Sequence, residues 1–280
     1  MADISGSVFP DAAQYLRDFE WLVSCPSLLN FPEALSTEFL DGDRTLDFGP
    51  VESFLDSKAA FRVGYYAEAL LDVWLDYTRQ PEEVQRSIQV QDGNQTVGEL
   101  DFLYRVAGQW RHLEVALKFY LHCPKTNETG SHFVGPNSAD TFERKRDRFF
   151  NHQLPLGKER FPKVDVSEVI MKGMIFYPPG VDDSVSLPEG LNPDHRRGRW
   201  IRETELGWLK ENSGASGGVL LDKPFWLSGV PFSESLPQLS CAIRQHFEKR
   251  RHPIFVSLKD GEGREKERVF VVPDEWPAKS

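Results

Sequence analysis

The sequence predicts an α/β fold in which a mixed sheet is flanked by helices. Three observations support this expectation. Apolar residues alternate along two neighbouring segments, 98–106 and 109–120, as in the two strands of a β-hairpin. Helical periodicity appears on either side of this hairpin, at 57–79 and at about 137–152. Near the end of the chain, a helical segment at about 234–251 precedes two strand-like segments, 254–258 and 268–272.

The 280 residues are expected to form three parts. A helical N-terminal arm occupies 1–56, where an apolar stripe at 11–36 is interrupted by Pro26 and followed by an Asp- and Gly-rich loop at 41–43. An α/β core occupies 57–180, with further strands at 87–91 and 169–177. The segment 178–193 holds four prolines and marks a boundary. A smaller α/β portion, 181–280, is expected to pack on the core.

Composition limits the classes of function. The formal net charge is -10, so binding of nucleic acid would need a local basic surface. The N-terminus lacks the pattern of a signal peptide, and no apolar run is long enough to span a bilayer. The three cysteines are widely separated, which favours a reducing compartment. We therefore expect a cytoplasmic protein that does not associate with a membrane.

The hairpin has a predictable register. Both strands carry apolar residues at every second position, and both apolar faces meet one core only if Phe102 lies opposite Leu113 and, one step further, 100 lies opposite 115. A two-residue turn at Ala107-Gly108 gives this register. It places Asp101 directly opposite Glu114 on the other face.

Two facing carboxylates repel each other, and a divalent cation converts that repulsion into coordination. Mg²⁺ or Mn²⁺ held by Asp101 and Glu114 would activate a water and neutralise charge on a phosphodiester. Glu99 and Lys118 share this face, with Lys118 as a cation near the nucleophile or the transition state. An amphipathic hairpin with a solvated charged face explains the pattern equally well.

The strand Gly98-Glu99-Leu100-Asp101-Phe102-Leu103 and the following Leu113-Glu114-Val115 resemble the active-site strands of the PD-(D/E)XK nuclease superfamily. They are most similar to endonucleases with a G-E-[IL]-D strand followed by an E-V-K strand. Together with 116–120 and 151–156, they make the chain similar to a bacterial family defined as domain of unknown function number eighteen fifty-three. The superfamily resemblance implies a metal-dependent nuclease core, with the metal on Asp101 and Glu114.

The sequence departs from the superfamily pattern at one position. The resemblance implies a catalytic lysine two residues after Glu114, where this chain has Ala116. Lys118 lies on the same face but about 6.6 Å further along the strand. It could reach back to the carboxylates or pair with Glu99, so metal binding is better supported than catalysis.

A third acid could come from the helix before the sheet. Members of the superfamily often supply one there, and Glu68 is the candidate, as a further metal ligand or the partner of a bound water. A glutamate at the rim of a half-buried helix is the simpler interpretation.

Basic residues follow the hairpin. Arg144, Lys145, Arg148, His152 and Gln153 are the candidates for contacts to nucleic acid. Acidic residues are interleaved with them, so a solvated, salt-bridged helix is the favoured alternative. Further basic runs lie at 195–200 and 249–252.

These observations give two hypotheses for function. The first is a Mg²⁺-dependent nuclease-like protein that hydrolyses phosphodiester bonds in DNA or RNA. The second is a catalytically inactive protein of the same fold that binds nucleic acid or another protein. The facing acids favour the first hypothesis, whereas the displaced lysine and the acidic net charge favour the second.

Overall fold

The computed structural model describes residues 11–34, 54–55, 62–124, 131–181, 185–211 and 214–277. Its helices are α1 (Ala12–Ser24), α4 (Val63–Trp74), η2 (Leu75–Arg79), α5 (Phe142–Arg148), η3 (Phe149–Gln153), α6 (Leu154–Arg160), η4 (Glu203–Glu205), α7 (Gly207–Glu211) and α8 (Leu236–Lys249). Its strands are β1 (Glu83–Asp92), β2 (Gln95–Val106), β3 (Gln109–His122), β4 (Phe133–Val134), β5 (Val164–Tyr177), β6 (Arg196–Arg202), β7 (Gly217–Leu221), β8 (Glu234–Ser235), β9 (Ile254–Lys259) and β10 (Glu265–Val272). The predicted loop at 41–43 and the predicted helical residues 35–36 and 57–61 lie outside the described residues.

The chain forms two compact units that interleave along the sequence. Unit 1 comprises 1–118, 143–173 and 188–195, and unit 2 comprises 119–142, 174–187 and 196–280. The chain passes from one unit to the other within β3 and within β5. The three-part division at 56 and 180 stays a prediction.

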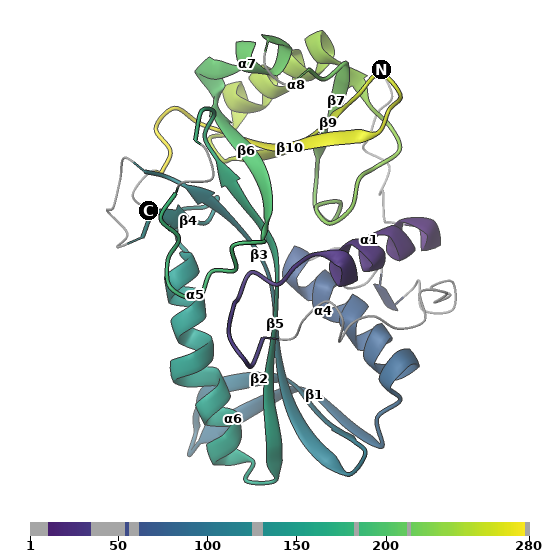
Figure 1. Ribbon diagram of the computed structural model, residues 1–280, viewed down its shortest axis with the longest axis vertical. Coiled ribbons are helices and arrows are strands. Elements are labelled where there is room, and N and C mark those ends of the chain that lie inside the picture. The colour runs from purple at the N-terminus through teal and green to yellow at the C-terminus, as the bar shows by residue number, and fades with distance from the viewer. Residues whose placement is uncertain are drawn as a thin grey trace. The chain divides into compact units, whose positions relative to one another are not determined.

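Unit 1 contains strands in the order β1-β2-β3-β5. The β1–β2 and β2–β3 pairs are antiparallel. In Figure 1, α4 lies to one side of these strands and the continuous α5–η3–α6 segment lies to the other. Unit 2 adds the parallel pairs β5–β6 and β6–β10 to antiparallel ones. The prediction of an α/β fold with a mixed sheet flanked by helices is therefore confirmed.

The hairpin turn and its register are as predicted. Ala107 and Gly108 both have positive φ, as a tight two-residue hairpin turn requires. Phe102 pairs with Leu113, and the pairing continues to Val106 and Gln109 at the turn. The expected pairing of 100 with 115 is wrong, because β2 and β3 stop pairing at Phe102–Leu113.

The predicted burial of the apolar residues is confirmed, since Leu100, Phe102, Val115 and Leu117 are all buried. The alternative of a solvated polar face is wrong at β3. His112 and Glu114 have no exposed surface, because the α5–η3–α6 segment covers them.

Unit 2 has its own core. Residues from α7 and α8, among them Leu209, Leu239, Ile243 and Phe247, pack against Val256 and its neighbours on β9 and β10. The aromatic rings of Phe119, Phe176, Trp226, Phe255 and Phe270 form a second cluster in this unit. Hydrophobic burial of this kind supplies the main driving force for folding.

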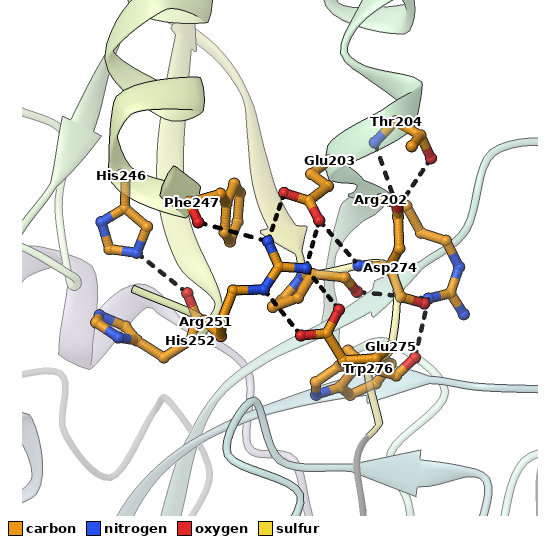
Figure 2. Close-up of polar contacts among 11 residues, drawn as sticks. Arg202, Glu203, Thr204, His246, Phe247, Arg251, His252, Asp274, Glu275 and Trp276 are labelled. Carbon is orange, nitrogen blue, oxygen red and sulfur yellow. Dashed lines mark hydrogen bonds and ion pairs between the residues drawn. The ribbon is translucent and has the colours of Figure 1, made fainter. Parts of the chain in front are cut away.

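Charged groups fasten the C-terminal end of unit 2. Figure 2 shows the Arg251 guanidinium between the carboxylates of Glu203 and Glu275. Beside it, the Arg202 guanidinium donates to the carbonyl oxygens of Asp274 and Trp276. The 273–276 segment is thereby tied to the end of β6 and to Arg251, two residues beyond the end of α8.

None of the helices in the described part of the chain combines the length and the hydrophobicity needed to cross a membrane.

Candidate functional site

Three carboxylates from separate elements gather in unit 1. Asp101 comes from β2, Glu114 from β3 and Glu68 from α4. Glu68, Asp101 and Glu99 line one cleft of about 610 Å³. The prediction that Glu68 lies near the acidic side of the hairpin is therefore confirmed in its geometry, while its role stays a prediction.

The end of the β2–β3 ladder positions Asp101. Where strand pairing stops, the Asp101 carboxylate accepts a hydrogen bond from the backbone N–H of Val115 at 2.7 Å. An aspartate side chain thus takes the place of a strand partner, which brings its carboxylate next to Glu114. Burial, together with the charge of Glu114, raises the pKa of Asp101 to about 7.

The pKa values of the other two carboxyl groups are raised as well. Burial, together with the charges of Asp101, Glu99 and Glu114, raises the pKa of Glu68 to about 8. Burial also raises the pKa of Glu114 to about 8, against the opposing charge of Lys145. Like charges have been brought together in a poorly solvated place, and strongly perturbed groups in a cleft indicate a functional site.

Two neighbours hold Glu114 in a fixed orientation. His112 Nε2 lies 2.8 Å from one carboxylate oxygen, and the Gln153 amide donates to the other. Burial lowers the pKa of His112 to about 4, so the ring is neutral at pH 7. A Cβ at Gly157 would lie 2.2 Å from His112 Nδ1, so α6 can cover this pair only with a glycine there.

Lys145 brings a positive charge to the acidic cluster. It projects from α5, with its Nζ 3.9 Å from the centre of the Phe149 ring. Its charge opposes the rise in pKa at Glu68, Asp101 and Glu114 alike. Burial, together with the nearby charge of Lys118, lowers the pKa of Lys145 to about 8.

The sequence interpretation placed Lys145 on a surface for nucleic acid and gave the catalytic position to Lys118. In the structure, Lys145 is the lysine whose charge acts on all three carboxyl groups. No local motif marks it, because it lies beyond the hairpin and reaches the site only through the packing of α5. The phenylalanine four residues later, which packs against its ammonium group, is the one sequence signal.

The other predicted contacts to nucleic acid divide into two groups. Arg144, Arg148 and His152 are exposed, and a ring nitrogen of His152 lies 3.2 Å from the carbonyl oxygen of Val97. Gln153 is buried, and its amide is used by Glu114, so its assignment to an exposed binding surface is wrong. The helical pattern does not distinguish the two groups, because it does not show which side of the helix faces the sheet.

In the described part of the chain, no group of three or more His, Cys, Asp or Glu side chains has the arrangement of a metal site. A magnesium ion does not require such a group, because it commonly keeps several waters and takes one or two protein carboxylates. The oxygen donors of Asp101 and Glu114 suit a hard cation of this kind. The charge of Lys145 already lowers the pKa values of these carboxyl groups, as a bound cation would.

Comparison with known proteins identifies one family. Its sequence profile, described as Domain of unknown function (DUF1853), matches residues 17–272. The chain belongs to this family. The match runs from within α1 to the end of β10 and includes all three carboxylates and Lys145. No curated protein and no solved structure matches the chain.

Proposed function

We propose that this DUF1853 protein is a divalent-metal-dependent nuclease that hydrolyses phosphodiester bonds in DNA or RNA. The observation that carries the proposal is the convergence of Glu68, Asp101 and Glu114 with Lys145. Acidic side chains on an ordinary hydrated surface are exposed and keep normal pKa values. These three are instead buried near one another, and their pKa values are raised. The proposal includes a PD-(D/E)XK-like arrangement of the core around β2 and β3.

The residues have separable roles in this proposal. Asp101 and Glu114 would hold Mg²⁺ or Mn²⁺, which supplies Lewis-acid activation of water and neutralises charge on the phosphate. Lys145 donates to a developing negative charge, and Glu68 accepts a hydrogen bond from the attacking water. His112 and Gln153 are positioning residues, because they bond to the Glu114 carboxylate and fix its orientation.

A second candidate function has its own support. Ala116 occupies the place where the resemblance implies a lysine, and hydrogen bonds already engage both oxygens of Glu114. A protein of this fold that binds nucleic acid or protein without cleaving would show both features. Each carboxylate oxygen nevertheless has two lone pairs, so the existing bonds leave room for a cation.

Calorimetry and cleavage assays on one pair of variants test the proposal. We expect Mg²⁺ or Mn²⁺ to bind the wild type, and Mn²⁺ to support cleavage of single-stranded, duplex or branched substrates. Asp101→Asn keeps the shape of the side chain and removes its charge, so it should weaken metal binding and lower cleavage by on the order of 10²-fold or more.

Asp92→Asn is the matched control, since this carboxylate is exposed at the end of β1. It should cleave at the wild-type rate. Equal cleavage by Asp101→Asn and Asp92→Asn would refute the proposed site. Metal binding without cleavage of any substrate, together with binding of one of them, would favour the inactive module.

A further inference from the structure

A second cavity lies wholly within unit 2. Its volume is about 590 Å³, within the range typical of small-ligand sites. The end of β7 and the loop after it form one wall, and α8 with the segment leading into β9 forms another. The charged and aromatic lining residues that matter here are Lys223, Arg250, His246, His252, Trp226 and Phe255.

The charge of this cavity is opposite to that of the chain. Two permanent cations, Lys223 and Arg250, line it together with His246 and His252. Among the described residues that line it, Asp222 is the single acid. A positive cavity on a chain of net charge -10 is a local feature, and such a cavity attracts anions.

The basic run 249–252 divides its side chains between two environments. Arg251 is neutralised, because its guanidinium bonds to Glu203 and Glu275. The residues on either side of it, Arg250 and His252, line the cavity instead. Figure 2 shows His246 and His252 together, apart from the carboxylates that surround Arg251, with a ring nitrogen of His246 3.2 Å from the His252 carbonyl oxygen.

The basic groups are close enough to influence one another. Burial lowers the pKa of His252, and the charges of His246, Arg250 and Lys223 lower it further, while Asp222 acts in the opposite direction. Like charges held together in this way repel, and a bound anion removes that repulsion.

We propose that this cavity binds the phosphate group of a nucleotide or of a single nucleic-acid strand. The cations supply charge-assisted hydrogen bonds to phosphate oxygens. The wall formed by Leu221, Ile254 and Phe255 is apolar and suits the planar face of a base or a sugar. Lys223 lies beside an aromatic ring of the cavity, with its Nζ 4.9 Å from the centre of the Trp226 ring.

The test measures binding of three probes, namely inorganic phosphate, adenosine monophosphate and a labelled single strand of about ten nucleotides. The full-length protein is used without divalent metal, so that binding is independent of the carboxylates in unit 1. We expect the double variant Lys223→Ala/Arg250→Ala to bind the preferred probe at least about tenfold more weakly. For the oligonucleotide, each lost contact should reduce the dependence of log K on log salt by about 0.7.

Lys249→Ala is the matched control, because Lys249 is exposed beside Arg250 and does not line the cavity. It should stay within about twofold of the wild type. If the double variant loses thermal stability, Lys223→Gln and Arg250→Gln are measured singly, and each should still weaken binding more than the control.

The pattern across probes identifies the source of the phosphate. Tighter binding of the oligonucleotide identifies a strand, and equal binding of the mononucleotide identifies a nucleotide pocket. Binding of inorganic phosphate alone would reduce the proposal to an anion site without a base. Absence of binding by all three probes, or equal affinity of the double variant and Lys249→Ala, would overturn it.

Discussion

The acids of the two units are treated in opposite ways. In unit 1, Glu114 is fully buried among other carboxyl groups, and burial raises its pKa to about 8. In unit 2, Glu275 is exposed and bonded to Arg251, which lowers its pKa to about 2. One environment disfavours the charged carboxylate, and the other favours it.

This difference distinguishes the candidate functional site of unit 1 from the structural ion pairs of Arg251 in unit 2. A carboxylate paired with a guanidinium has its charge neutralised and its hydrogen bonds made, so the arrangement is complete as it stands. Three carboxyl groups share the charge of Lys145, so full ionisation would leave the cluster short of positive charge, and the raised pKa values mean that bound protons make up for this shortage at neutral pH. That shortage is what a divalent cation would remove.

The largest effect that would sharpen this comparison concerns the two lysines. If the proposed nuclease function holds, Lys145→Met should lower metal-dependent cleavage by about 10²-fold, because the positive charge that acts on all three carboxyl groups is lost. Lys118→Met should have a smaller effect, less than about tenfold. Methionine keeps much of the length of each side chain, and rates at saturating Mn²⁺ would be compared.

The same variants can break the comparison. A greater loss of rate for Lys118→Met than for Lys145→Met would return the catalytic position to β3, as the sequence interpretation had it. A loss of thermal stability in Lys145→Met, with the rate unchanged, would make Lys145 a structural counter-ion only.

The second effect is the response of stability to pH. Asp101, Glu68 and Glu114 have pKa values of about 7, 8 and 8 in the folded state, above their unfolded values near 4. Between those values the folded state holds more protons than the unfolded state, so stability falls as the pH rises through the window. The lowered pKa of His112 affects stability below about pH 6.5, and Lys145, whose pKa is lowered to about 8, acts in the opposite direction near the top of the range. The three carboxyl groups therefore set the sign of the change between about pH 6.5 and 8.

We expect the metal-free protein to lose roughly 2 to 3 kcal/mol of unfolding free energy per pH unit in this range, since the folded state holds about two more protons there. Asp101→Asn should flatten the decline and be more stable than the wild type at pH 8, because it relieves repulsion with Glu114. Asp92→Asn should follow the wild type. Urea unfolding at several pH values measures this, and parallel curves for all three proteins would show that the carboxyl groups do not repel one another.

The hairpin could be predicted from sequence because its information is local. Alternation along each strand and the Ala107-Gly108 turn together determine the register between Phe102 and Leu113. The end of the pairing beyond that point could not be predicted, because it depends on the Asp101 carboxylate accepting the Val115 N–H. A polar side chain that replaces a backbone partner leaves no trace in a hydrophobic pattern.

The parts that sequence reasoning missed depend on tertiary packing. The sequence indicates only a basic run at 195–200 where the structure has β6, because the arginines of this strand interrupt the alternation of polar and apolar residues. The burial of Glu114 and the position of Lys145 both follow from the docking of α5–η3–α6 on β3. A periodic pattern identifies a helix and its apolar side, but not the polar groups that it carries into a neighbouring element.

The smallest effect concerns the fastening in unit 2. Arg251, Glu203 and Glu275 have side chains that are 47%, 20% and 50% exposed, so solvent screens their attraction. Arg251→Ala should therefore lower the melting temperature by only a few degrees, roughly one to four, and less at high salt. The melting temperature of Arg251→Lys should lie between those of the wild type and Arg251→Ala, because lysine keeps the charge but cannot make the bidentate contacts of a guanidinium group.

The pH dependence of this fastening has the opposite sign to that of unit 1. The pKa of Glu275 is lowered to about 2, so the stabilisation is present above its unfolded value near 4.5 and is lost as the pH falls toward 2. Thermal unfolding of the wild type and Arg251→Ala should therefore differ at pH 7 and converge near pH 2 to 3. A difference that instead persisted at low pH and high salt would show that Arg251 acts through the packing of its side chain on Phe247, with its guanidinium carbon 5.8 Å from the ring centre, and not through charge.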